Sequence, residues 1–259
     1  MLHPRIIPCL LIHNSGLVKT EKFRSPKYVG DPINAVRIFN EKEVDELVIV
    51  DIDATVKNRE PNYALIEKLA SECRMPLCYG GGIKSVEQAI KIFNLGVEKI
   101  ALSSAALDNP KLISEIAGEV GTQSVVVVLD VKKKIFGGYE IYTHNATKKR
   151  KLSIDDALEL LLSKGVGEIV INSIDNDGLC KGYDTDLIDK VNKQINIPMT
   201  ALGGCGSIND IEELFDKFGI IGAAAGSYFV FKGKYKAVLI SYPSVEDKQK
   251  IIQKRIKSD

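Results

Sequence analysis

This sequence lacks a net charge, because 35 lysine and arginine residues are matched by 34 aspartate and glutamate residues for a formal charge of +1. Nucleic-acid-binding domains usually carry a clear basic excess, so we expect no nucleic-acid partner, and any anion site must be local. The sequence also lacks an apolar run of the ~18 residues that a membrane span needs. The segment from Met1 to Arg5 lacks the charged and apolar regions of a secretory signal. We therefore expect no membrane partner.

Cysteine is scarce, and its spacing matches no disulfide framework or metal motif. The five cysteines are Cys9, Cys73, Cys78, Cys180 and Cys205. Cys9 and Cys205 lie within or just after apolar segments, where a thiol packs as a small hydrophobic group. The sequence thus suggests no metal and no organic cofactor. Reduced cysteines favour a cytoplasmic location.

Short apolar segments alternate with amphipathic helical patterns along the whole sequence. Strands are predicted over residues 5–11, 47–52, 76–79, 98–103, 124–130, 168–172, 197–202 and 221–225. Helices are predicted over Val86–Leu95, Ile154–Lys164 and Ile208–Phe218, with another after Asn109-Pro110. Ser244 and Asp247 have the spacing of an N-terminal cap for a last helix over 244–257.

The two halves of the sequence repeat each other at an offset of roughly 120 residues. Residues 46–50, which lead to Asp53, match residues 168–172, which lead to Asp175. Four strand–helix units in each half favour a closed parallel barrel over a doubly wound open sheet. No G-x-G-x-x-G motif opens the first unit. We predict one domain over residues 1–259, a (β/α)8 TIM barrel with half-barrels of about 1–122 and 123–245.

Two segments are longer than ordinary connections. Residues 13–32 read as a polar loop after the first strand, and loops of this length are usually functional or disordered. After Asp130 a hairpin is predicted, with its turn near Gly137-Gly138 and Tyr139–Tyr142 as the return strand. The basic run 148–151 that follows is typical of a solvated face.

The repeat is broken at one chemically important position. In barrels of this type the active site lies at the carboxyl ends of the strands, which we call the mouth. Residues two apart on a strand share a face. Val126, Val128 and Asp130 should therefore share one face with Asp130 at the mouth, where the first half has Leu11 instead. Asp130 is the first catalytic candidate.

Glycine clusters follow apolar strands at equivalent places in both halves. Glycine allows backbone N–H groups to approach an anion closely. The candidate phosphate-binding residues are Gly81, Gly82, Ser103 and Ser104 in the first half, and Gly203, Gly204, Gly226 and Ser227 in the second. Two such sites on opposite sides of the mouth suit an elongated substrate with a phosphate at each end.

Four charged residues stand near strand starts, at the end of the barrel opposite the mouth. They are Arg5, Glu46, Lys99 and Glu168. These charges predict either a neutral salt-bridge plug or a gate. Burying ion pairs contributes little stability, so a gating role is credible beside a purely structural one.

Several motifs resemble the cyclase subunit of imidazole glycerol phosphate synthase. They are residues 5–10, the triple glycine with Ile83, residues 173–178 and residues 182–184. The resemblance covers residue 1 to about residue 240. It implies a (β/α)8 barrel with a separate glutaminase subunit at the bottom. Ammonia would pass through the barrel and react with a doubly phosphorylated substrate, giving imidazole glycerol phosphate and an aminoimidazole carboxamide ribotide.

The resemblance also implies roles for individual residues. The four charges match an ammonia gate, and Asp130 matches a catalytic general acid/base. Lys19 matches a lysine of a mobile substrate loop, while Asp175 and Asp177 fall in a substrate-binding motif. The glycines match the phosphate motifs, but Ser103 stands where the family usually has asparagine.

The chief departure is Leu11, which replaces a second catalytic aspartate of the family. Asp53 ends the second strand and could take over that role. Residues 28–35 and 40–46 resemble a second-copy subgroup linked to acetamidino modification of bacterial surface sugars, where ammonia is used to make an amidine. Three functions therefore stay open: a synthase subunit for sugar amidination, an authentic histidine-pathway cyclase, and a non-catalytic ammonia conduit that activates the glutaminase.

Overall fold

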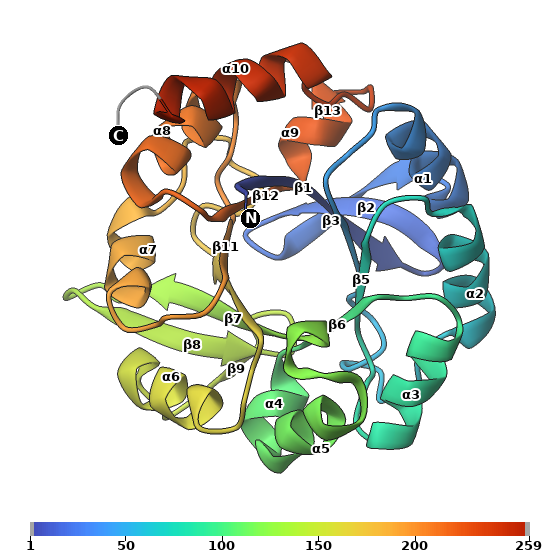
Figure 1. Cartoon of the computed structure of the whole chain (residues 1–259), viewed down its shortest axis with the longest axis vertical. Helices are drawn as coiled ribbons and strands as arrows, with labels where there is room; N and C mark the ends of the chain where they lie inside the picture. Colours follow the sequence, from blue (N-terminus) through green and yellow to red (C-terminus); the bar gives the residue numbers. More distant parts are fainter. Residues whose placement is uncertain (1–2, 257–259) are drawn as a thin grey trace.

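Eight parallel strands form a closed barrel in the computed structural model, which describes residues 3–256 (Figure 1). In order around the barrel the strands are β1 (Arg5–His13), β4 (Leu47–Asp51), β5 (Leu77–Gly80), β6 (Lys99–Leu102), β7 (Val125–Lys133), β10 (Glu168–Ser173), β11 (Met199–Leu202) and β12 (Gly222–Ala225). The pairing of β12 with β1 closes the ring. The predicted (β/α)8 TIM barrel is confirmed, and each predicted strand overlaps an observed one.

Helices surround the barrel and cover the outer faces of its strands (Figure 1). They are α1 (Pro32–Glu41), α2 (Tyr63–Glu72), α3 (Val86–Asn94), α4 (Ser104–Asp108), α5 (Lys111–Val120), α6 (Ile154–Leu162), α7 (Thr185–Asn192), α8 (Ile208–Phe218), α9 (Ser227–Val230) and α10 (Val245–Ile256), with a 3-10 turn η1 (Thr122–Ser124). The capping box of Ser207 and Asp210 starts α8, because each side chain accepts from the other residue's backbone N–H. The last helix begins as predicted, with Asp247 N donating to Ser244 Oγ at 3.1 Å. Residue 257 of that prediction lies outside the described residues.

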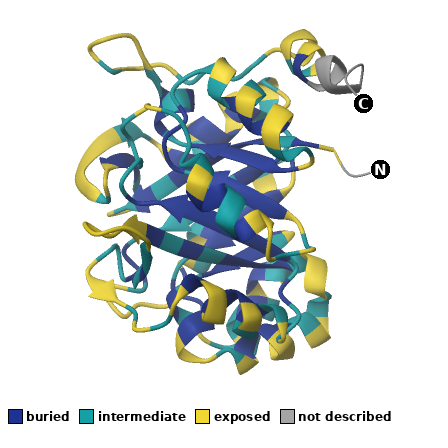
Figure 2. Ribbon diagram, turned by 90° about the vertical axis from the view of Figure 1, so that its left-hand side faces the viewer, coloured by how far each residue is buried: buried dark blue, intermediate teal, exposed yellow. Residues whose placement is uncertain are grey.

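The apolar core has two layers. The larger one fills the space between the barrel and its helices and includes Phe39, Phe215 and Phe229, all fully buried. A small second layer lies inside the barrel and is built around Cys78, Ala101, Val126 and Val170. Figure 2 shows this arrangement, with buried strands in the centre and exposed positions on the helices and loops. Small interior side chains leave room for a cavity along the barrel axis.

The prediction of a polar loop over 13–32 is wrong, because most of this segment is a double β-hairpin. β1 continues to His13 and pairs with β2 (Gly16–Glu21), which pairs with β3 (Arg24–Gly30). Asn14 and Ser15 both have positive φ, as do Lys22 and Phe23 at the second turn. Positive φ at both central residues is the geometry of tight two-residue hairpins. The hairpin buries Val18 and Thr20 over the mouth.

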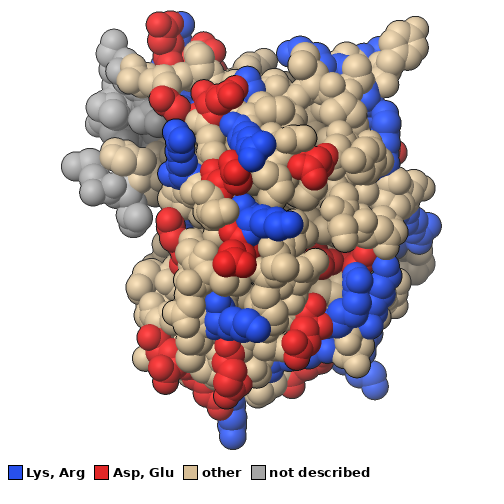
Figure 3. Space-filling model, turned by 90° about the vertical axis from the view of Figure 1, so that its right-hand side faces the viewer, with Lys and Arg blue, Asp and Glu red and all other residues tan. Residues whose placement is uncertain are grey.

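The predicted hairpin after Asp130 is confirmed. β7 extends to Lys133 and pairs with β8 (Tyr139–Thr143), which pairs with the short β9 (Lys148–Lys149). The basic run is largely solvated, although Lys149 pairs with Glu140 and Arg150 with Asp108. Elsewhere on the surface both signs of charge are interspersed, as the face in Figure 3 shows.

Within residues 3–256, no helix has the length and apolar character needed to cross a bilayer. The five cysteines are free thiols. The predicted division into two half-barrels stays a prediction.

Candidate active site

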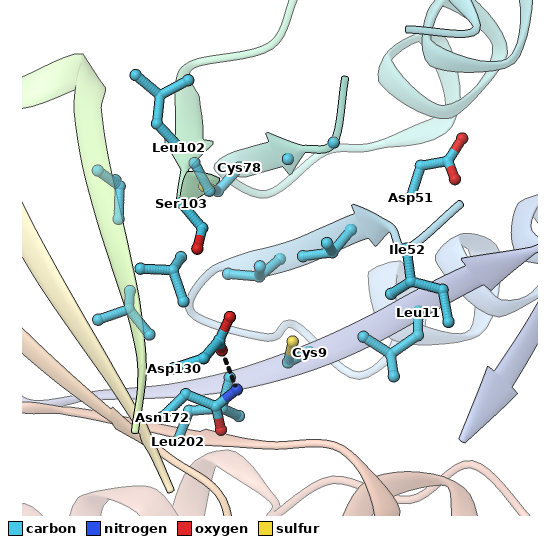
Figure 4. Close-up of a pocket in the computed structure, with 18 of the residues that line it drawn as sticks. Cys9, Leu11, Asp51, Ile52, Cys78, Leu102, Ser103, Asp130, Asn172 and Leu202 are labelled. Atoms are coloured by element: carbon cyan, nitrogen blue, oxygen red, sulfur yellow. Dashed lines mark hydrogen bonds between the residues drawn. The ribbon is translucent and has the colours of Figure 1, made fainter. Parts of the chain in front are cut away.

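A single cavity of about 180 Å³ follows the barrel axis. Glu46, Glu168 and Thr200 line its lower part, and Leu11 and Asp130 line the mouth. The wall between them is mostly apolar, and Val126 and Val170 are among its lining residues. Figure 4 shows Cys9 and Cys78 pointing into the cavity. The alternation of strand residues produces this wall, because every second residue of a barrel strand faces the interior.

Asp130 lies on the mouth wall beside Asn172, whose Nδ2 donates to Asp130 Oδ1 at 2.8 Å (Figure 4). Burial in the apolar wall raises the pKa of Asp130 to about 7, and the nearby Asp177 carboxylate acts in the same direction. Hydrogen bonds from Asn172 and Ser103 offset only part of this rise. A carboxyl group with this pKa can donate or accept a proton near neutral pH. Asn172 Oδ1 is buried and has no hydrogen-bond partner among the described residues.

Asp51 ends β4 and is the carboxylate that the predictions missed. Its side chain lines the cavity and accepts from Asp53 N at 2.9 Å and Ala54 N at 3.1 Å. Figure 4 shows Asp51 near Ile52 and Leu11, away from Asp130. Leu11 presents only methyl groups to the mouth, so it can take no part in proton transfer.

Asp53 is not brought to the cavity. It is 4% exposed and is not among the lining residues. Its carboxylate accepts from Asn14 N at 2.9 Å and pairs with His13 at 2.8 Å and Lys57 at 3.0 Å. Burial alone would raise the pKa of Asp53, but these partners outweigh it and lower the pKa to about 2. The contacts describe a structural carboxylate that ties β1 to the segment after β4.

The first glycine cluster meets the cavity. Gly81 and Gly82 have positive φ, and a Cβ on Gly81 would overlap the carbonyl oxygen of Asp51. Ser103 and Ser104 follow β6 and line the same part of the wall. The structure therefore brings the four predicted first-half residues together.

The second cluster is arranged differently. Gly226 lines the cavity, whereas Gly203, Gly204 and Ser227 are not among the lining residues. A Cβ on Gly226 would overlap the amino group of Lys19, which donates to the Cys9 carbonyl. Burial lowers the pKa of Lys19, against the opposing effects of Cys9 and Asp177. A buried lysine thus sits beside the second glycine cluster.

Asp175 and Asp177 have separate surroundings. Asp175 Oδ2 accepts from Lys133 N at 2.7 Å, and Asp175 is not a cavity residue. Asp177 lines the cavity and accepts from Thr20 Oγ1 at 2.9 Å and Phe23 N at 3.2 Å. Asp177 therefore anchors the β2–β3 hairpin over the mouth. Burial raises its pKa, although these hydrogen bonds and Lys19 act in the opposite direction.

The four charges at the bottom form a closed ring of ion pairs. Arg5 contacts Glu46 at 2.5 Å and Glu168 at 2.7 Å, and Lys99 contacts each glutamate at 3.0 Å. Thr200 Oγ1 also donates to Glu168 Oε1 at 2.6 Å. Burial would raise the pKa of Glu168, but Arg5 and Lys99 outweigh it and lower the pKa to about 2. The ring consists of two cations and two carboxylates whose charges sum to zero, and it lies where the cavity ends.

Two further cavity residues were not predicted. His144 and Asn145 lie in the turn between β8 and β9 and line the mouth. The sequence marks this turn only weakly, because it holds no glycine or proline. Across the described residues, no cluster of three or more metal-ligating side chains is placed to hold an ion.

Comparison with known proteins gives consistent relatives. The family model for the histidine biosynthesis protein matches residues 5–236. A provisionally named imidazole glycerol phosphate synthase subunit, hisF3 of Vibrio vulnificus, is 56% identical, with 98% of each chain covered. The similarly provisional subunit hisF2 of Pseudomonas aeruginosa is 54% identical, covering 95% of this chain and 98% of that one.

A third relative carries the unqualified family name. The imidazole glycerol phosphate synthase subunit HisF of Natranaerobius thermophilus is 38% identical, covering 90% of this chain and 92% of its own. The higher identities to hisF2 and hisF3 place the chain with second-copy members of the group. This chain belongs to the histidine biosynthesis protein family, within the enzyme subunits of the HisF type.

Proposed function

We propose that this chain is the synthase subunit of a two-component glutamine amidotransferase. A separate glutaminase binds at the bottom of the barrel, and its ammonia passes through the barrel to an acceptor at the mouth. The acceptor is an acetamido sugar of a surface glycan, which becomes an acetamidino sugar. The chain works in the cytoplasm as one half of a heterodimer.

The observation that carries this proposal is the cavity that joins the charged ring to Asp130. Ammonia is small and neutral, so an apolar wall such as Cys78, Val126 and Val170 would let it pass without binding it. The ring of Arg5, Glu46, Lys99 and Glu168 closes the lower end in this conformation. One cation must move aside for passage, which is the behaviour of a gate.

At the mouth, Asp130 supplies proton transfer and Asn172 positions it. When ammonia attacks an electrophilic carbon, the nitrogen gains positive charge and must lose protons. Ionised Asp130, with a pKa of about 7, is suited to accept one. The unpartnered Asn172 Oδ1 is an acceptor in the same wall, and it fits an N–H group of ammonia or of the acceptor.

The two glycine clusters are the proposed phosphate sites, and their positions suit an extended, phosphorylated acceptor. Lys19 adds a cation beside Gly226, and bare backbone near Gly81 and Gly82 allows close approach. Three of the proposed phosphate-binding residues do not line the cavity: Gly203, Gly204 and Ser227. They would contribute to phosphate binding from behind the cavity wall. Asp175 and Asp177 would act by holding the loops that shape the mouth.

Leu11 favours amidination over the histidine-pathway reaction. The cyclase chemistry needs separate proton donation and acceptance, and each step contributes about 100-fold or more. Asp53 is engaged with His13, Asn14 and Lys57, so it offers no second group at the mouth. Amidine formation instead replaces a carbonyl oxygen by nitrogen, and a third protein would activate that oxygen for departure.

The experiment supplies purified chain with ammonium salt and the doubly phosphorylated cyclase substrate, and follows imidazole glycerol phosphate. Free ammonia removes the need for the glutaminase. We expect no turnover by the wild type and measurable turnover by Leu11→Asp. Gain of activity would show that the scaffold and phosphate sites survive while the chemistry has changed.

Two outcomes would argue for the other functions. Wild-type turnover that disappears in Asp130→Asn would establish an authentic histidine-pathway cyclase. If Asp130→Asn has no effect on the output of the reconstituted amidination pathway, the chain is a conduit that only delivers ammonia.

A further inference from the structure

The turn between β8 and β9 contacts Ser104, one of the four candidate phosphate residues of the first half. Asn145 Nδ2 donates to Ile52 O at 2.8 Å and so ties the turn to the segment after β4. His144 Nδ1 lies 3.1 Å from Thr143 Oγ1 and 3.4 Å from Ser104 Oγ. His144 therefore stands directly beside the candidate phosphate residues that follow β6.

The backbone of this turn is unusual. His144, Asn145 and Ala146 have φ of 54°, 54° and 60°, the left-handed region that side chains other than glycine seldom adopt. Strained segments persist only where surrounding contacts fix them, and they often occur at functional sites. The Asn145 bond is such a contact, and it fixes the imidazole of its neighbour at the cavity wall.

The imidazole of His144 reaches the cavity from the turn itself. β8 ends at Thr143, and His144, the next residue, lines the cavity beside Ser104. Tyr142 on β8 lies opposite Asp130 on β7, so the turn begins close to the catalytic candidate. Nε2 of His144 has no hydrogen-bond partner among the described residues, so it is available to a ligand.

The charges around the cavity leave a place for a cation at this position. Among described residues that line the cavity, Lys19 is the sole lysine or arginine, and it lies at the other glycine cluster. The charged groups on elements around the turn are Asp51, Asp130, the Lys149–Glu140 pair and the Arg150–Asp108 pair, with the exposed Lys148 beyond. The paired cations do not reach the cavity.

We propose that His144 completes the first glycine cluster as a binding site for a phosphate monoester, with Nε2 donating to a phosphate oxygen. The proposal rests on the phosphate-binding part of the proposed function. Lys19 and His144 then give each end of the acceptor one side-chain N–H donor.

The test is sulfate binding, followed by NMR on protein with ¹³C-labelled histidine. Sulfate is used because it stays a dianion near neutral pH, whereas a phosphate group changes its own charge there. The chain has three histidines, so His3 and His13 serve as internal references. We expect the His144 resonance to move with sulfate at a fixed pH while the other two stay.

His144→Gln identifies the resonance and tests the role, with His3→Gln as the matched control. We expect His144→Gln to weaken sulfate binding by about fivefold or more and His3→Gln to leave it unchanged. Equal sulfate affinity in wild type and His144→Gln would overturn the inference while leaving the glycine site intact. No sulfate binding by the wild type would overturn the inference too. The ammonium assay with Leu11→Asp tests the proposed function separately. If the phosphate site itself were absent, that variant would be inactive.

Discussion

Asp130, the proposed proton-transfer group at the mouth, carries a cost to stability. Its pKa is about 7 in the folded chain against an ordinary 3.8, so the folded state holds the proton more tightly between these values. The free energy of unfolding therefore falls as the pH rises through this window. A shift of about 3 units corresponds to about 4 kcal/mol at most. A carboxylate kept in this wall is explained by chemistry better than by packing.

Asp130→Asn removes the ionisation and keeps an oxygen for Asn172. We expect the variant to match the wild type near pH 4 and to exceed it by about 1–4 kcal/mol at pH 8 in urea unfolding. Asp53→Asn is the control of opposite sign, because the pKa of Asp53 is lowered to about 2. It should lose stability at pH 8. An Asp130→Asn variant less stable than wild type at pH 8 would contradict the assignment.

At the residue scale, sequence reasoning found positions whose side-chain face follows from strand alternation. Asp130 is such a position, since Val126 and Val128 precede it at intervals of two and also line the cavity. It failed for Asp51 and Asp53, because the turn after β4 breaks the alternation. Lys57 is a local partner of Asp53, four residues along the chain, but nothing local shows that Asp53 will meet His13, which comes from β1.

At the scale of elements, the two hairpins show what periodicity detects. β8 was predicted because Gly137-Gly138 marks the turn and Tyr139–Tyr142 alternates in polarity. The β2–β3 hairpin was missed because its turns contain no glycine, although Asn14 tolerates positive φ well. Its lysines suggested a solvated loop, yet Lys19 is 6% exposed. The bond from Lys19 to the Cys9 carbonyl and the anchoring at Asp177 are tertiary contacts that no local pattern encodes.

The turn after β5 depends on glycine, and the chain provides a matched test. Gly81 has φ of +119°, and any Cβ there would overlap the Asp51 carbonyl. We expect Gly81→Ala to lower the free energy of unfolding by about 2–4 kcal/mol. Gly118 is exposed within α5, and a Cβ added there would have no atom of another residue within 4 Å. Gly118→Ala should instead add about 0.5–1 kcal/mol, and equal effects in thermal unfolding would argue against strain at Gly81.

At the scale of the whole molecule, the sequence predicts that the barrel closes. It predicts the arrangement of the charged residues at the barrel bottom only in part. Eight strand signals with intervening helices leave few topologies, and a right-handed crossover rule removes most of the rest. The four ring charges could be grouped because all stand near strand starts. That each cation contacts both glutamates, and that Thr200 joins Glu168, is a tertiary arrangement that the sequence does not specify.

The ring joins parts of the chain that are far apart in sequence, so its ionisation should affect global unfolding. Glu168 has a pKa of about 2 in the folded chain against an ordinary 4.5. A lowered pKa contributes stability that is complete above pH 4.5 and is lost as the pH falls toward 2. This shift of about 2.5 units corresponds to about 3 kcal/mol. Acid should therefore open the barrel from its bottom ring.

Glu168→Gln tests this in urea unfolding between pH 7 and pH 3. At pH 7 the variant leaves Arg5 and Lys99 with one glutamate, and we expect it to be about 3–5 kcal/mol less stable than the wild type. The gap should narrow as the pH falls below 4.5, because the unfolded wild type then takes up a proton at Glu168 that the folded state does not bind until about pH 2. Glu119→Gln, at an exposed position of α5, should follow the wild type throughout. A difference in stability that stays constant down to pH 3 would mean that Glu168 stabilises the barrel by packing and not by its charge. The ring could then not act as a charged gate.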